Sequence, residues 1–104
     1  METRIYKITG EKYREAKKIL EGDQYAEVSF ARQGYKLREG GKLEGGEAGA
    51  YYVLIGGDEK FFKWAEEKMG ALAAKLSGKD FEKIKKAYDD EAGAAEAGLG
   101  SLFG

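Results

Sequence analysis

The side chains that most often carry out catalysis are absent from this sequence or stand alone in it. The chain has 104 residues and contains no cysteine and no histidine. This composition excludes disulfides, thiolate metal ligands, cysteine nucleophiles and the proton relay from serine to histidine. Ser29, Ser77 and Ser101 would each need a lysine as general base. We therefore predict a protein that is not an enzyme, with no catalytic residue and no cofactor.

Carboxylates are the remaining side chains that could hold a metal ion. They are most concentrated at Glu66-Glu67 and at Asp89-Asp90-Glu91. A hard cation needs oxygen ligands that converge from a constrained loop, whereas consecutive residues on a helix point in diverging directions. We predict no metal site.

The segment Gly40-Gly41-Lys42 invites a phosphate-loop interpretation. Such a loop needs Ser or Thr directly after the Gly-Lys pair, where Leu43 stands here, and Gly34 lies too far upstream to be its first glycine. The segment also precedes a predicted strand, so it lacks the helix N-terminus that attracts phosphate. We expect residues 40–49 to form a flexible surface loop that is anchored by Leu43.

Basic side chains cluster between residues 32 and 42, close to several tyrosines. Basic and aromatic residues interleaved on strands can bind single-stranded nucleic acid through phosphate contacts and base stacking. The same charges suit the solvated side of an edge strand, and the net charge of −1 argues against a general nucleic-acid binder. A weak nucleic-acid-binding module that uses the hairpin of residues 25–42 is one alternative function, with these contact residues: Arg32, Lys36, Arg38 and Lys42.

The C-terminal segment is apolar although it follows a stretch rich in glycine and alanine that is unsuited to a core. Chain ends are usually polar and frayed unless something holds them in place. Leu99, Leu102 and Phe103 therefore need a surface to pack against. We predict a compact domain of residues 1–92 and a flexible tail of residues 93–104, whose three large apolar residues bind a protein partner. The main functional prediction is a small, adaptor-like interaction protein.

The same tail resembles two known docking signals. The segment Glu96 to Phe103 resembles the peptide that binds sliding clamps, whose first position is usually Gln, fourth aliphatic, and last two aromatic. Leu99 and Phe103 match this pattern, whereas Glu96 and Leu102 differ from it. Leu102-Phe103-Gly104 resembles the hydrophobic–aromatic–any ending that ATPase regulators insert into proteasome rings, with Phe in place of Tyr. These resemblances imply a sliding clamp or a proteasome-like ring as partner.

Aromatic residues are densest at Phe61, Phe62 and Trp64. Aromatic residues at helical spacing usually belong to a core. These three cover more than one face of the predicted helix, so some of them could instead form an interface. A structural homo-oligomer, associated through Phe61 and Trp64 or by exchange of tails, is the other alternative function.

The hydrophobic pattern predicts the elements that must position these residues. We expect strands at residues 3–8, 25–32, 35–38 and 50–55, and helices from residue 10 to Gly22, from the N-cap Asp58 to about Ser77, and from Asp80 to about residue 90. Gln33-Gly34 is expected to turn a hairpin in which Phe30 faces Leu37. Residues 50–55 do not alternate, which favours an interior strand.

This order, β-α-β-β-β-α-α, predicts an α+β fold. We expect a mostly antiparallel four-stranded sheet with helices packed on one face. The 36% charged residues and the absence of asparagine resemble the composition of thermophilic proteins, and predict an archaeal or deep-branching bacterial source. No apolar run reaches the roughly 20 residues of a membrane helix, and the N-terminal region lacks a signal-peptide pattern, so we expect a cytoplasmic protein.

Overall fold

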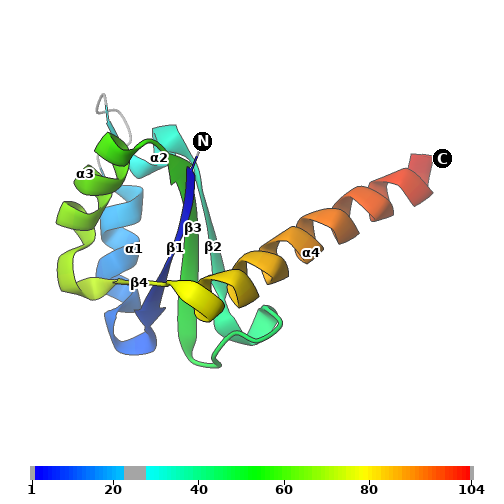
Figure 1. The fold of residues 1–104 in the computed structure, drawn as a ribbon, viewed down its shortest axis with the longest axis horizontal. Coiled ribbons are helices and arrows are strands. Elements are labelled where there is room, and N and C mark those ends of the chain that lie inside the picture. Colours follow the sequence, from blue (N-terminus) through cyan, green and yellow to red (C-terminus); the bar gives the residue numbers. More distant parts are fainter. Residues whose placement is uncertain (1, 23–27, 104) are drawn as a thin grey trace.

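The computed structural model describes residues 2–22 and 28–103, and the side chains of residues 2–22 and 28–91. Figure 1 shows a sheet with helices on both sides and one long helix that projects from the body. The strands are β1 (Glu2–Thr9), β2 (Tyr35–Glu39), β3 (Ala50–Gly57) and β4 (Ala74–Lys75). The α-helices are α1 (Tyr13–Glu21), α2 (Phe30–Gln33), α3 (Glu59–Met69) and α4 (Gly78–Phe103). Three short 3-10 helices are η1 (Gly10–Lys12), η2 (Gly40–Lys42) and η3 (Gly70–Leu72).

The strands form one antiparallel sheet in the order β2-β3-β1-β4. The two central strands pair over their whole length, from Glu2 opposite Gly57 to Thr9 opposite Ala50. The sheet is built from two units, β1-α1-β2 and β3-α3-β4. In the sheet, β3 lies between β1 and β2, and β1 lies between β3 and β4. This is the split β-α-β topology of ferredoxin-like domains. The predicted α+β class with a mostly antiparallel four-stranded sheet is confirmed.

Both faces of the sheet are covered, because successive side chains of a strand point to opposite faces. Val53 and Ile55 join the core formed with α1, α2 and α3. Ala50 and Tyr52 join a second core formed with α4. Figure 1 shows α4 on the side of the sheet opposite to α1 and α3. The interior position predicted for residues 50–55 is therefore confirmed. The prediction that all helices pack on one face is wrong, because the last helix, α4, covers the face opposite to α1, α2 and α3.

The predicted strand 25–32 and its hairpin are wrong in the described part of that segment. Residues 23–27 lie outside the described residues, and residues 30–33 form α2. The buried side chain of Ser29 accepts a hydrogen bond of 3.1 Å from the backbone N–H of Arg32, which caps a helical turn. Gly34 then ends the turn at φ +91°, a conformation that favours glycine. Phe30 is buried as predicted, but it enters the core from a helix.

The helix predicted to run from Asp58 to Ser77 ends earlier. Asp58 caps it as expected, and Met69 is its last residue. Gly70 at φ +52° breaks the helix, and the chain then forms β4 at the sheet edge, where the N–H of Leu76 donates to the carbonyl of Ile5 (2.9 Å). β4 thus replaces residues 25–32 as the fourth strand. Gly78, the residue after the predicted helix end at Ser77, instead begins α4.

The last helix continues well beyond the acidic residues at 89–91, where it was expected to end. α4 spans 26 residues and reaches Phe103. The predicted tail therefore falls largely within a helix. The side chains of residues 92–103, and all of residue 104, lie outside the described residues, so the flexibility of this segment stays a prediction.

The glycine-rich segment 40–49 packs closely on itself and on its neighbours. A Cβ at Gly40 would collide with the carbonyl oxygen of Glu47, and one at Gly10 would lie 2.7 Å from the carbonyl oxygen of Gly49. Leu43 is buried in the core beneath α4, as its predicted anchoring role requires. Several of these glycines therefore serve close backbone packing.

Candidate functional site

The structure separates the basic residues that sequence analysis had grouped. Arg32 lies on α2, on the side of the sheet that holds α1 and α3. Lys36 and Arg38 lie on β2, and Arg38 faces α4, where its Nε is 2.6 Å from Oε1 of Glu91. Lys42 ends η2. The hairpin that should have brought these side chains to one face is not formed by residues 28–42.

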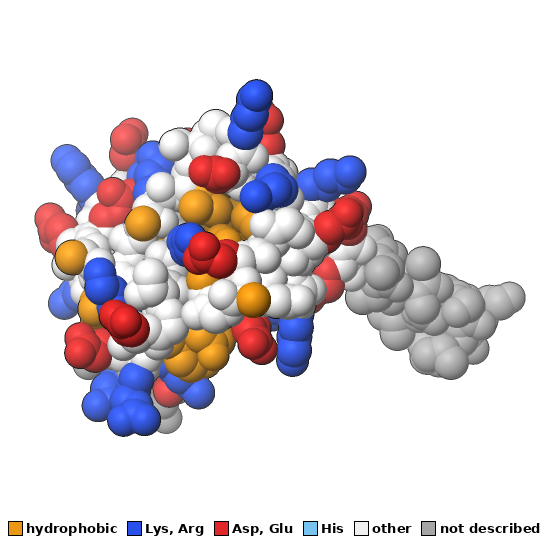
Figure 2. Space-filling view, turned by 90° about the horizontal axis from the view of Figure 1, so that it is seen from below, with side chains coloured by type: hydrophobic (Ala, Val, Ile, Leu, Met, Phe, Trp, Pro, Cys, Tyr) orange, Lys and Arg blue, Asp and Glu red, His pale blue; other side chains and the backbone are white. Residues whose placement is uncertain are grey.

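Charges of both signs are mixed on the surface that Figure 2 shows. Lys and Arg side chains stand among Asp and Glu side chains over this whole face. Such a surface lacks the basic stripe that contacts the backbone of a nucleic acid. The view gives no support to an extended nucleic-acid interface on this side.

The base of α4 is firmly attached to the sheet. Ile84, Ala87 and Tyr88 are buried in the core that they form with Tyr52. The Tyr88 hydroxyl lies within donating distance of two strand carbonyls, those of Lys36 (3.0 Å) and Tyr52 (2.9 Å). A tyrosine hydroxyl is protonated at neutral pH and can donate to these carbonyls, and burial raises the pKa of Tyr88 further.

Beyond this anchor, α4 leaves the body of the protein. The ion pair of Glu91 with Arg38 is the outermost contact of α4 among the residues whose side chains are described. At about 1.5 Å per residue, the helix is about 39 Å long. Figure 1 shows its outer part pointing away from α2 and α3. Positions 99, 102 and 103 have the spacing of one helical face, although their side chains lie outside the described residues.

An open cleft lies on the opposite side of the molecule, between α2 and α3. Its volume is about 490 Å³. Phe61 and Trp64 stack in its wall with ring centroids 5.6 Å apart, and Phe30 lies behind Trp64 at 5.0 Å. Val28 is 47% exposed and is the one exposed large apolar side chain among the described residues. The residues lining the cleft are Val28, Ser29, Arg32, Gln33, Asp58, Lys60, Phe61 and Trp64.

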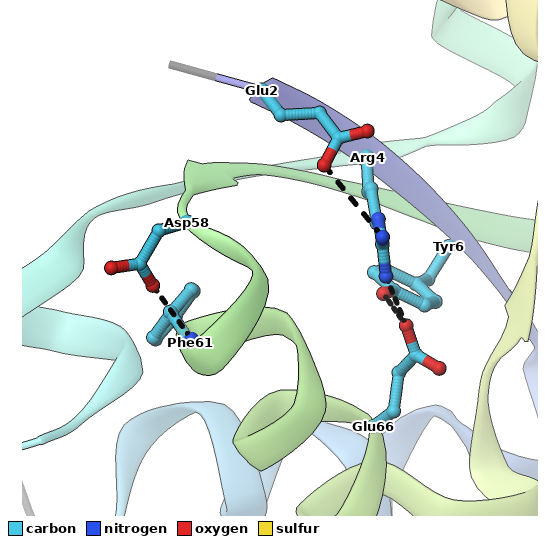
Figure 3. Close-up of polar contacts among 6 residues, drawn as sticks. All are labelled: Glu2, Arg4, Tyr6, Asp58, Phe61 and Glu66. Atoms are coloured by element: carbon cyan, nitrogen blue, oxygen red, sulfur yellow. Dashed lines mark hydrogen bonds and ion pairs between the residues drawn. The ribbon is translucent and has the colours of Figure 1, made fainter.

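α3, which forms one wall of this cleft, is fixed at two points (Figure 3). At its start, Oδ1 of Asp58 accepts a hydrogen bond of 2.8 Å from the N–H of Phe61. Farther along, Oε2 of Glu66 accepts from the Tyr6 hydroxyl at 2.8 Å and from Nη1 of Arg4 at 2.7 Å. The hydrogen bond from Tyr6, with that from Arg4, lowers the pKa of Glu66, while burial raises the pKa of Tyr6.

Arg4 strengthens this connection between β1 and α3. Its guanidinium lies 4.3 Å from the ring centroid of Phe62, a cation–π contact, and 3.6 Å from Oε2 of Glu2. The cluster thus joins the start of β1 to the middle of α3. It holds the cleft wall in place and leaves no described acidic side chain of the cluster unpaired.

The cleft was not predicted from the sequence, although part of its signal was visible. Asp58 and the aromatic residues Phe61 and Trp64 stand out in the sequence, and the structure places the buried Phe61 and the half-buried Trp64 in the wall of the cleft. Val28 and Gln33 were misplaced because residues 25–32 were assigned to a strand. The sequence signal for α2 was Ser29, because serine is a preferred N-cap residue.

Other site classes find no support in the described residues. Within residues 2–22 and 28–91, no three acidic side chains gather as metal ligands would. No helix in the part of the chain that was searched is long and apolar enough to cross a membrane.

Comparison with known proteins adds no candidate function. The chain matches no protein-family model, no curated protein and no solved structure. A fold of this topology supports many unrelated functions, so its function has to be inferred from the sites described above.

Proposed function

We propose that this protein is a small, non-enzymatic interaction protein that presents the outer part of α4 to a protein partner. Leu99, Leu102 and Phe103 are the residues that make contact. The compact β-sheet domain serves as the base that orients the helix.

The observation that carries this proposal is the contrast between the two parts of α4. The first part is held by Ile84, Ala87 and Tyr88, and the second part projects from the domain. Each glycine in a helix interior costs about 1 kcal/mol relative to alanine, and Gly93, Gly98 and Gly100 all occur in the outer part. A partner groove that accepts one apolar face would offset this cost, as in other complexes of a helix in a groove.

The helix also favours one of the two resemblances over the other. The peptide that binds sliding clamps must form a single helical turn, and α4 is helical up to Phe103. A sliding clamp is therefore the partner to test first.

The proposal can be tested with purified proteins. Binding of the full chain to a sliding clamp would be measured by isothermal titration calorimetry, and compared with binding of Phe103→Ala. A buried aromatic anchor typically costs 2 kcal/mol or more to truncate, so we expect affinity to fall about thirtyfold. The thermal midpoint should not change, because position 103 lies far from the domain cores.

Ser101→Ala is the matched control, since position 101 does not share the face of 99, 102 and 103. It should bind with unchanged affinity. Binding of the full chain to a proteasome core ring, without binding to a sliding clamp, would show that Leu102-Phe103-Gly104 acts as the ending that enters proteasome rings. Failure to bind either ring, or a lower thermal midpoint for Phe103→Ala, would contradict the proposal.

A further inference from the structure

We infer that the cleft between α2 and α3 binds a nucleoside monophosphate, or a ligand of the same chemistry: a planar aromatic ring that carries a phosphate. This site is on the other side of the molecule from the projecting helix. The inference is therefore independent of the function proposed for α4.

The shape of the cleft suits a ligand of this size. Small-molecule sites usually measure about 300–1,000 Å³ and combine an apolar wall with a few polar groups, and this cleft of about 490 Å³ falls within that range. The half-buried indole of Trp64, backed by Phe30 and Phe61, offers a surface on which a planar ring can stack. Val28 supplies further apolar area at the same site.

The charges around the cleft suit a phosphate. Lys60 and Trp64 are four residues apart on α3 and therefore lie on the same side of the helix, about 5–6 Å apart at their Cβ atoms. A ring stacked on Trp64 would place an attached phosphate near the Lys60 ammonium. Arg32 supplies a second positive charge from α2. Because Arg32 already interacts within the protein, we assign the main phosphate contact to Lys60.

The single carboxylate among the described lining residues is already engaged. Oδ1 of Asp58 accepts the capping hydrogen bond from Phe61, so its charge is partly compensated by the start of α3. This leaves the Lys60 ammonium as the group at this wall that a phosphate on the stacked ring would contact.

Both walls are held in position before any ligand arrives. Nε2 of Gln33 donates a hydrogen bond of 2.8 Å to the carbonyl of Gly56, which ties α2 to the end of β3. α3 is fixed by Asp58 and by the contacts of Glu66 with Arg4 and Tyr6. A site on rigid elements loses little conformational entropy when it binds a ligand.

Trp64 gives a direct measurement, because it is the one tryptophan in the chain. The fluorescence of the full-length protein, excited at a wavelength that adenine does not absorb, would be titrated with AMP, with adenosine and with inorganic phosphate. We expect AMP to produce a saturable change. Adenosine should bind at least threefold more weakly, and phosphate alone should leave the fluorescence unchanged.

Two variants on α3 separate a built site from general charge attraction. Lys60→Ala should weaken AMP binding about threefold to tenfold, in keeping with the loss of one partly exposed charged hydrogen bond. Lys63→Ala removes the same charge from an exposed position outside the cleft and should leave the affinity unchanged. Circular dichroism would show that both variants are folded.

Three results would overturn the inference: no saturable response to AMP, equal weakening by both variants, or a response to phosphate as strong as that to AMP. The α4 proposal is tested separately, because Phe103→Ala should bind AMP as the unaltered protein does. Absence of partner binding with intact AMP binding would therefore contradict only the proposal for α4. Intact partner binding without AMP binding would contradict only the inference about the cleft.

Discussion

The carboxylate of Glu66 shows how one exposed side chain can organise its surroundings. It accepts hydrogen bonds from a buried tyrosine and from an arginine, which both lie on the same strand. Its two donors, Tyr6 and Arg4, lie on β1, whereas Glu66 lies on α3, so the contacts join segments about 60 residues apart in the chain. Neither donor could be matched to Glu66 from the sequence, because their proximity depends on the packing of α3 over the sheet.

Removing the Tyr6 hydroxyl should weaken this connection. Tyr6→Phe keeps the buried ring but takes away one donor to a charged acceptor, and we expect a loss of about 1 kcal/mol in the free energy of unfolding. Urea denaturation at neutral pH measures this loss. Tyr13→Phe is the matched control. The ring of Tyr13 stacks on that of Tyr51, with centroids 3.7 Å apart, and this contact does not involve the hydroxyl that the substitution removes. Equal stability of Tyr6→Phe and the unaltered protein would show that the hydrogen bond contributes nothing.

Glu66 should also make stability depend on pH. Its pKa in the folded protein is lowered from the ordinary value of 4.5, so its stabilising contribution is present above that pH and disappears as the pH falls through the folded pKa. In Glu66→Gln this titrating group is absent. The difference in free energy of unfolding between the two proteins should therefore shrink from pH 7 to pH 3, as measured by urea denaturation at each pH. A difference that stays constant over this range would contradict the assignment.

Local signals within single elements were largely readable from the sequence. The strands at residues 3–8, 35–38 and 50–55 lie within β1, β2 and β3, and Asp58 caps α3 as predicted. These elements follow from alternation, burial and capping, which are properties of neighbouring residues.

The errors came from segments whose structure depends on distant partners. Leu72 and Leu76 continue the helical spacing of α3, which predicts a helix up to Ser77. The structure instead has η3 at residues 70–72, and Ala74–Lys75 pair with the edge of β1 as β4. The alternation of residues 25–32 is typical of a strand, yet the cap at Ser29 and the core beneath α3 favour a helical turn at residues 30–33. The cleft could not be predicted for the same reason, because one of its walls is α2.

The hydroxyl of Tyr88 should prove important for the attachment of α4. Tyr88→Phe leaves the ring in the core but removes the donor to the carbonyls of Lys36 and Tyr52. We expect a loss of about 1–2 kcal/mol in the free energy of unfolding, together with faster hydrogen exchange at the base of α4. Lys85→Ala breaks only the exposed pair with Asp89 and should change stability by less than about 0.5 kcal/mol. A similar effect of the two substitutions would argue against an anchoring role for Tyr88.

At the scale of the whole molecule, the two cores predict where the chain can be shortened. A chain that ends after Glu91 keeps both cores and the Arg38 contact, so its thermal midpoint should stay within a few degrees of the full chain. A chain that ends after Asp80 loses Ile84, Ala87 and Tyr88 and exposes an apolar sheet face. We expect this shorter chain to aggregate or to melt far earlier, as circular dichroism and light scattering would show. A stable, monomeric chain of residues 1–80 would mean that α4 is not part of the folded unit.

The pairing of β1 with β3 has a consequence for the order of events during synthesis. Each residue of β1 waits for a partner that is about 40 to 55 residues farther along the chain. At roughly 5–20 residues per second, the ribosome takes several seconds to deliver that partner. Through this interval the apolar residues of β1 have neither sheet nor core to cover them. The nascent chain therefore passes through a stage in which β1 is open to chaperones and to other nascent chains. The pairing of β1 with β3 is a long-range contact, and such contacts slow folding relative to local ones.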